Sequence, residues 1–257
     1  MPSLTFLGAT GTVTGSRFLL KTAHKQYLID CGLFQGLKEL RLRNWEPFPI
    51  SPEDIDAVIL THAHIDHTGY LPRLVHYGFK GTIYATTATT DLCQILLPDS
   101  AHLQEEDAEY ANKKHFSKHS PALPLYTTED ALQALELFKP IAYGSRLQLD
   151  DGVSLTFQDA GHILGSSFID LRLPIDGEER RLLFSGDLGR PNQPILRDPH
   201  TVFGADYLIV ESTYGDRLHG NEDPKEVMAR IINESIRRGG VLLIPSFAVG
   251  RTQELLY

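Results

Sequence analysis

The sequence of 257 residues lacks several features that mark particular classes of protein. It has two cysteines, Cys31 and Cys93, and they form no C-x-x-C motif, which excludes a disulfide framework and favours a reducing cytoplasm. No run of about 18 apolar residues occurs, so we expect no membrane-spanning segment and no membrane partner. The opening residues combine no basic region with an apolar one, so we predict no secretory signal.

Positive charge is scarce relative to negative charge. The 24 Lys and Arg residues are outnumbered by 33 Asp and Glu, and the resulting net charge of −9 argues against a broad electrostatic surface for nucleic acid. A bound metal ion would add local positive charge that this sum does not count. With 42% hydrophobic and 22% charged residues, the composition is that of a globular protein able to bury a core.

Strand-like and helix-like patterns follow one another in two similar halves of the chain. Each half begins with short apolar runs separated by turn residues, which predict strands, and continues with helical patterns. We therefore expect an α/β (α+β) fold in which two sheets are flanked by helices. Ser51, followed by a proline, predicts a helix start. Further helices are expected over 87–114, 128–139 and 223–240, and the apolar run 241–245 predicts a buried strand.

The most informative motif is His62-x-His64-x-Asp66-His67, which directly follows the apolar strand pattern. Side chains two residues apart at the end of a strand point the same way, so His62 and His64 can hold one metal ion from one side. The chain then turns, and Asp66 and His67 can face a second ion. Four ligand-type residues within six positions favour a metal site over a chance cluster on a polar loop.

Three further residues at predicted strand ends extend this candidate site. His162 has small neighbours that let the backbone approach an ion. Asp187 has the position expected for a carboxylate that bridges two ions, and two metals about 3.5–4 Å apart can clamp both oxygens of a displacement. Asp30 can orient one of the histidines, the alternative being an ordinary turn aspartate.

The spacing of these residues resembles that of the metallo-β-lactamase superfamily over about residues 1–190. Its first four motifs are matched by Asp30, the cluster 62–67, His162 and Asp187. The resemblance implies a four-layered αβ/βα metallo-β-lactamase fold over residues 1–210, lacking its C-terminal completion.

Two later segments narrow the resemblance. Glu211-Ser-Thr-Tyr-Gly-Asp-Arg217 and Pro245-Ser-Phe-Ala-x-Gly-Arg-x-Gln-Glu254 look like the entry into a β-CASP region. That region marks the nucleic-acid-processing branch that includes the pre-mRNA 3′-end endonuclease. We therefore expect residues 211–257 to be the start of a β-CASP domain, with Glu211 as the acidic residue at its head.

This resemblance implies a zinc-dependent hydrolase of RNA phosphodiester bonds, acting as an exonuclease or an endonuclease. One Zn²⁺ ion is expected on His62, His64 and His162, and the second on Asp66, His67 and Asp187; Mn²⁺ also suits such ligands. The expected catalytic set comprises Asp66, which would orient the nucleophile, Glu211 and Asp30.

Single-stranded RNA is the substrate that the resemblance implies. Ser246 and Arg251 are candidate phosphate contacts, although Arg251 could equally pair with Glu254. A cytoplasmic protein is expected, and a homodimer is compatible with the sequence.

The sequence departs from the family pattern at its end. The family uses one histidine inside the β-CASP insertion for proton transfer and another after it as a metal ligand, and neither lies before Tyr257. We therefore expect an N-terminal part of a longer protein with an incomplete site. Two alternatives remain open: a thioesterase or lactonase of the same superfamily, which the negative charge favours, and an inactive fragment that binds a partner through apolar surface around VLLIPSF.

Two other patterns favour structural explanations. The glycine-rich segment Gly8–Gly15 lacks the G-x-G-x-x-G spacing of a nucleotide loop and is expected to pack closely at the floor of the site. His115 and His119 have helical spacing, but nearby prolines disfavour a helix there and no acidic third ligand is adjacent, so we expect surface histidines.

Overall fold

The computed structural model describes residues 2–218, 220 and 222–257. The chain forms two compact units, a larger one that extends to Glu211 and a smaller one, Ser212–Tyr257. Within these described residues, the larger unit contains two β-sheets and five α-helices, and the smaller unit contains two helices.

The first sheet has six strands in sequential order. Its first three strands form the predicted antiparallel meander, and the last three run parallel to their neighbours. The carboxyl ends of the central strands therefore meet at one edge, where α/β proteins place their ligands. The strands are β1 (Ser3–Phe6), β2 (Phe18–Lys21), β3 (Gln26–Ile29), β4 (Ala57–Ile59), β5 (Thr82–Thr86) and β6 (Phe138–Ile141).

The second sheet has five strands in the order β11-β10-β9-β8-β7. Neighbouring strands are antiparallel except β10 and β11, which are parallel. Alternate residues, such as Leu155 and Phe157 of β8, point inward, while Thr156 between them faces the other way. The strands are β7 (Leu147–Gln148), β8 (Ser154–Asp159), β9 (Ser167–Ile175), β10 (Glu178–Phe184) and β11 (Tyr207–Ile209).

The two sheets pack face to face, and their inner side chains form the main core. Ile29 and Ile59 from the first sheet lie against Ile169, Leu171 and Phe184 from the second, and all five are almost fully buried. Each such side chain contributes about 1.5–3 kcal/mol by leaving water. The packing of the sheets thus fixes the distance between loops that are far apart in sequence.

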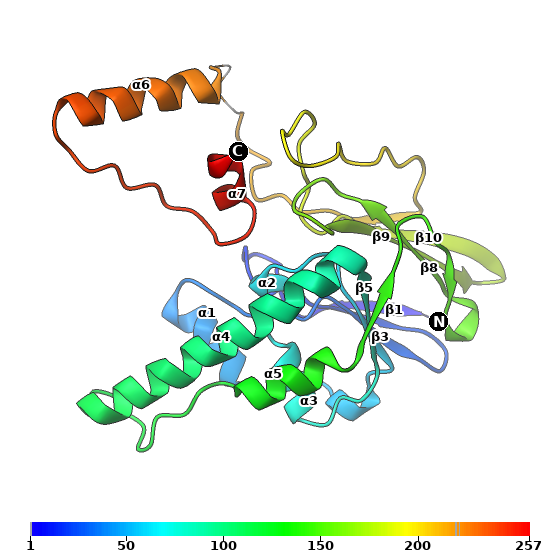
Figure 1. The fold of residues 1–257 in the computed structure, drawn as a ribbon. Coiled ribbons are helices and arrows are strands. Elements are labelled where there is room, and N and C mark those ends of the chain that lie inside the picture. The colour runs from blue at the N-terminus through cyan, green and yellow to red at the C-terminus, as the bar shows by residue number, and fades with distance from the viewer. Residues whose placement is uncertain (1, 219, 221) are drawn as a thin grey trace. The chain divides into compact units, whose positions relative to one another are not determined.

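Helices cover the outer side of the first sheet (Figure 1). They are α1 (Lys38–Leu42), α2 (Ile65–Thr68), α3 (Leu71–His76), α4 (Thr87–Lys114) and α5 (Thr128–Leu135). Three of the four expected layers, one helical and two of sheet, therefore lie within the described residues of this unit. The side chain of Thr86 caps α4 by accepting a hydrogen bond from the Thr89 N–H.

Two predicted helices in this unit are shorter than expected. The pattern over 128–139 stops as a helix at Leu135, and the residues that follow form β6 instead. β6 lies at the edge of the sheet. Proline has no N–H group to donate, so Pro140 is tolerated on an edge strand and would disrupt a central one. Ser51 begins only a 3-10 turn, Pro52–Asp54, and its side chain makes no capping bond.

Two helices lie in the described residues of the smaller unit: α6 (Pro224–Arg237), which the sequence predicts over 223–240, and α7 (Arg251–Leu256). The prediction of a buried strand at 241–245 was wrong. The described residues of this segment pair with no strand, and Val241 and Leu243 are 87% and 83% exposed. An apolar run becomes a strand only where a neighbour accepts its backbone hydrogen bonds.

Candidate metal centre

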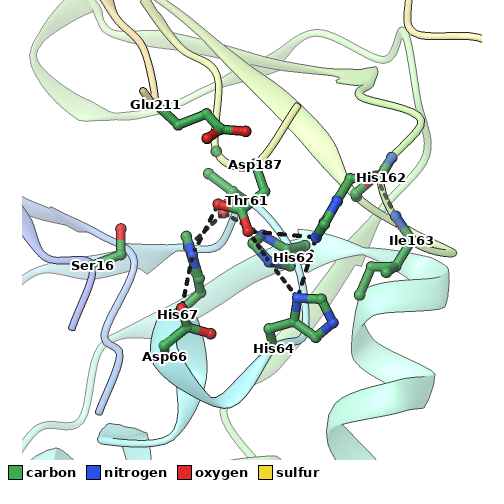
Figure 2. Close-up of polar contacts among 12 residues, drawn as sticks. Ser16, Thr61, His62, His64, Asp66, His67, His162, Ile163, Asp187 and Glu211 are labelled. Carbon is green, nitrogen blue, oxygen red and sulfur yellow. Dashed lines mark hydrogen bonds and ion pairs between the residues drawn. The ribbon is translucent and has the colours of Figure 1, made fainter. Parts of the chain in front are cut away.

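The predicted ligands converge at one edge of the two sheets (Figure 2). His62 and His64 follow β4, and Asp66 and His67 lie on the single turn of α2. From the second sheet, His162 lies between β8 and β9, and Asp187 follows β10. Residues nearly 100 positions apart thus come within hydrogen-bonding distance, as His64 and His162 do.

Three imidazole nitrogens form one side of the centre, which we call the imidazole side. His64 Nδ1 lies 3.1 Å from His62 Nε2 and 3.3 Å from His162 Nε2. Asp187 Oδ2 completes the group, 3.7 Å from His62 Nε2 and 3.4 Å from His162 Nε2. One ligand atom from each of these four residues lies within 4.8 Å of the others.

A second group of donors, which we call the carboxylate side, lies next to the first. His67 Nε2 is 3.7 Å from Asp66 Oδ2 and 3.3 Å from Asp187 Oδ1. Asp187 therefore presents one carboxylate oxygen to each side. A carboxylate that bridged two ions would need this orientation.

The donor set of the imidazole side fits a divalent metal ion. With Zn–N bonds of about 2.0–2.1 Å, tetrahedral ligands lie about 3.4 Å from one another. Four of the donor pairs here are 3.1–3.7 Å apart, and all four ligand atoms lie within 4.8 Å of one another. Imidazole and carboxylate together suit zinc and manganese alike. The His62, His64, His162 and Asp187 group could thus hold a metal ion.

A buried hydrogen-bond network behind the ligands orients two of the imidazoles. Asp30 Oδ2 accepts a hydrogen bond from His67 Nδ1 at 2.7 Å, which leaves Nε2 to face the carboxylate side. The hydroxyl of Thr61 lies 2.9 Å from Asp30 Oδ2 and 3.0 Å from His62 Nδ1. Because its one proton goes to the carboxylate, its oxygen accepts from His62 Nδ1–H, and His62 Nε2 keeps its lone pair. Ser16 also donates to Asp30.

Close backbone packing holds the α2 turn in place. Ser16 N–H donates to the carbonyl of Asp66, and Cys31 N–H donates to the carbonyl of His67. A Cβ on Gly32 would lie 1.5 Å from the Asp66 carbonyl oxygen, so only glycine fits there. Within the Gly8–Gly15 segment, the backbone of Gly8 lies directly against that of Gly15.

The charges of the centre shift the pKa values of its members. Burial lowers the pKa of His62 well below its usual range, and His67 adds to this by charge repulsion. Burial would also lower the pKa of His67, but Asp30 and Asp187 outweigh it and raise that pKa well above the usual range. Burial alone would raise the pKa of Asp187, but the neighbouring histidines lower it strongly. Without a metal, His67 therefore carries the positive charge that balances Asp187.

Hydroxyl groups at the end of β5 and the start of α4 fix the loop that carries His162. The hydroxyls of Thr86 and Thr89 donate to the carbonyl of Gly165 at 2.6 and 2.8 Å. Ser166 Oγ accepts from the His162 N–H at 2.9 Å. Sequence reasoning missed these positioning residues and Thr61, whose one available signal was that it directly precedes His62.

The structure brings Glu211 to this centre but does not relate Ser246 or Arg251 to it. Glu211 Oε1 accepts a hydrogen bond from the Leu188 N–H at 3.0 Å, so its carboxylate lies against the loop of Asp187. Ser246 and Arg251 belong to the smaller unit. There Arg251 pairs with Glu254 at 3.4 Å, which is the alternative that the sequence left open.

A family model described as the metallo-beta-lactamase superfamily matches residues 11–221. The chain therefore belongs to the metallo-β-lactamase superfamily, as its fold and its His and Asp cluster indicate. Both cysteines are free, as expected, and both are buried. No helix among the described residues has the length and apolarity needed to cross a membrane.

Two curated relatives are similar over nearly the whole chain. Ribonuclease TTHA0252 of Thermus thermophilus is 41% identical over 252 residues, which are 97% of this chain and 53% of that protein. Transcription termination factor FttA of Methanocaldococcus jannaschii is 35% identical, over 98% of this chain and 38% of that protein. The chain thus spans about half or less of the length of these relatives.

Solved structures of metallo-β-lactamases are also similar to this chain. Native FEZ-1 metallo-beta-lactamase from Legionella gormanii aligns with a TM-score of 0.44 and 17% identity. The alignment covers 74% of this chain and 63% of that one.

Proposed function

We propose that this protein is a metal-dependent ribonuclease that hydrolyses phosphodiester bonds of single-stranded RNA with two zinc ions, Mn²⁺ being the second choice of metal. The observation that carries the proposal is the placement of Asp187, with Oδ1 facing His67 and Oδ2 facing His62 and His162. One carboxylate between two donor groups is suited to a pair of ions about 3.5–4 Å apart.

When bound, the two ions would polarise the phosphate and lower the pKa of water from 15.7 to about 7. The residues of the chain hold and orient this centre. His62, His64 and His162 supply neutral imidazoles, and Asp66 and His67 supply the donors of the other side. Asp66 is the carboxylate placed to orient the attacking water, and Asp30 keeps His67 in the ligand tautomer. Glu211 positions the loop of Asp187 through Leu188.

The choice of RNA rests on the names of the relatives, a ribonuclease and a transcription termination factor. The motifs after residue 210 favour the same choice, and we assign residues 211–257 to the start of a β-CASP domain. Ser246 and Arg251 are the proposed phosphate contacts of that domain.

The free, buried cysteines support a cytoplasmic location. A homodimer is the assembly that we propose to test by sedimentation, and a monomer at all concentrations would contradict it.

Cleavage of an end-labelled single-stranded RNA tests the proposal. The protein should cleave in the presence of Zn²⁺ or Mn²⁺, stop when a chelator is added and recover when the metal is restored. The product ladder distinguishes attack from an end from internal attack. Cleavage that continues in chelator, or a metal-loaded protein that leaves RNA intact, would contradict the proposal.

A further inference from the structure

The far end of α4 carries a compact group of cations and aromatic rings that the metal centre does not use. Lys113, Lys114 and Lys118 are all exposed, and no acidic residue occurs between Tyr110 and Thr128. None of the ion pairs in the described part of the chain involves these three lysines. Their positive charge is therefore available to a partner. We call this group, together with Tyr110 and Phe116, the α4 tip.

Two aromatic side chains of the α4 tip are exposed to solvent. Tyr110 is 57% exposed and Phe116 is 65% exposed. Their ring centroids are 6.0 Å apart, and Lys114 Nζ lies 5.9 Å from the centre of the Tyr110 ring. Exposed rings next to cations form the combination that binds single strands, because bases stack on the rings while the cations contact phosphates.

The loop after α4 is held in shape by its own hydrogen bonds. The helix ends where His115 takes a left-handed conformation, with φ of 54°. The side-chain amide of Asn112 then pairs with the backbone of Ala122, donating at 2.9 Å and accepting at 2.7 Å. Phe116 and Lys118 are thus presented on a closed loop, which lowers the entropy cost of binding a partner. His115 and His119 are exposed in the same loop, as the sequence predicted.

The α4 tip is connected to the metal centre by one continuous helix. α4 begins at Thr87, next to the Thr86 hydroxyl that holds the His162 loop, and has 28 residues. At 1.5 Å per residue its length is about 42 Å. Figure 1 shows its far end projecting beyond the first sheet. A strand stacked at about 3.4 Å per nucleotide would need about 12 nucleotides to extend from one end of α4 to the other.

We propose that the α4 tip is a docking surface for single-stranded RNA, which holds the strand about 12 nucleotides away from the bond at the metal centre. This inference rests on the proposed function for its substrate class. The charge complementarity is local: the tip is basic although the chain carries a net charge of −9, and the acidic residues Glu105–Glu109 on the preceding turns bound it on one side. Such a surface gives a preference for long strands and no preference for sequence.

The test compares RNA of about 6 and about 24 nucleotides, chosen to be shorter and longer than the length of α4. Binding is measured with chelator present, so that no cleavage occurs, in the protein and in a variant with Lys113→Ala, Lys114→Ala and Lys118→Ala. We expect the variant to bind the long RNA at least about tenfold more weakly and the short RNA equally well. The slope of log affinity against log salt for the long RNA should fall by about 2, since each lost phosphate contact on a single strand removes about 0.7.

Two controls separate this effect from net charge and from folding. A second triple variant, with Lys38→Ala, Lys80→Ala and Lys139→Ala, removes the same charge from exposed positions elsewhere and should leave both affinities unchanged. Phe116→Ala should weaken long-RNA binding about fivefold or more through lost stacking, without altering the charge.

The outcomes distinguish this proposal from the proposed function. If the protein cleaves RNA but the tip variant binds long RNA as tightly as the unmodified protein does, the α4 tip is overturned and the ribonuclease stands. If the protein instead cleaves no RNA, yet binds long RNA in a length-dependent way that the tip variant loses, the α4 tip is supported and the ribonuclease is overturned. Equal weakening by both triple variants would also overturn the tip, because net charge alone would then explain the binding.

Discussion

The two sides of the metal centre differ in how the chain supplies their donors. The carboxylate side takes Asp66 and His67 from one turn of helix, and buried contacts with Asp30 and the backbone near Gly32 fix that turn. The imidazole side joins His62 and His64 to His162, which lies on a loop of the other sheet. Contacts with loops of the first sheet therefore set the positions of Asp66 and His67, whereas the packing of the two sheets sets the distance from His64 to His162. Asp187 lies between the two sides.

If Asp187 serves both sides, its loss should have the largest effect. We expect Asp187→Asn to lower RNA cleavage by about 10³-fold or more, since metal polarisation contributes several kcal/mol and each 1.36 kcal/mol is tenfold in rate. Elemental analysis should show fewer metal ions per chain than in the unmodified protein. Asp91→Asn, at an exposed position on α4, is the matched control and should change neither quantity. A variant that retains both ions would show that Asp187 does not bridge.

Asp66→Ala tests the carboxylate side alone. Because Asp66 would orient the nucleophile, cleavage should fall by about 10²–10⁴-fold. The metal of the imidazole side should remain, since Asp66 contributes no donor to it, and the circular dichroism spectrum should be unchanged. Undiminished turnover in a metal-clean preparation would remove Asp66 from the mechanism.

Thr61 links both sides, and its hydroxyl can be removed without changing the shape of the side chain. We expect Thr61→Val to weaken zinc binding by about 10–100-fold, the usual cost of losing a group that orients a ligand, and Thr61→Ser to restore it. Thr90→Val, which removes a buried hydroxyl bonded to the Thr86 carbonyl, is the control for a general loss of stability. Competition against a chromophoric chelator measures these affinities, and equal weakening in the Val and Ser variants would contradict the role of the hydroxyl.

The raised pKa of His67 predicts a smaller, pH-dependent difference between the sides. A metal on the carboxylate side must displace the His67 proton, so metal affinity there should fall by up to tenfold per pH unit below that pKa. The imidazole side should depend less on pH, because the pKa values of His62 and His162 are lowered by burial. Calorimetry in buffers of different ionisation heat measures the released protons. Asp30→Asn should reduce the release, and an unchanged release would contradict this origin.

The segment from His62 to His67, which supplies donors to both sides, was the easiest part of the centre to predict from the sequence. The donors of the motif from His62 to His67 lie within six positions after a strand, so their spacing alone indicates a site. The distance from His64 to His162 depends instead on how the two sheets pack, and no pattern within either segment predicts it. The family resemblance indicated that these two histidines belong to one site. Thr61, Thr86 and Thr89 were missed because a hydroxyl that positions a loop has no characteristic spacing.

Secondary structure was predictable where the hydrophobic periodicity is strong. It was less predictable where the conformation depends on whether an adjacent strand is present to pair with. The length of α4 agrees with its pattern, and so do the three strands of the first meander. The end of α5 was misjudged because the residues after it have helical spacing but pair with β5. The apolar run at 241–245 was misjudged for the opposite reason, since the described residues offer it no strand to pair with.

Anomalous X-ray diffraction from zinc-loaded crystals of the protein would decide whether Asp187 bridges two ions, because it locates each ion independently of activity. We expect two zinc peaks about 3.5–4 Å apart, one next to His62, His64 and His162 and one next to Asp66 and His67, with Asp187 between them. A single peak at saturating zinc, or two peaks that do not share Asp187, would contradict this expectation.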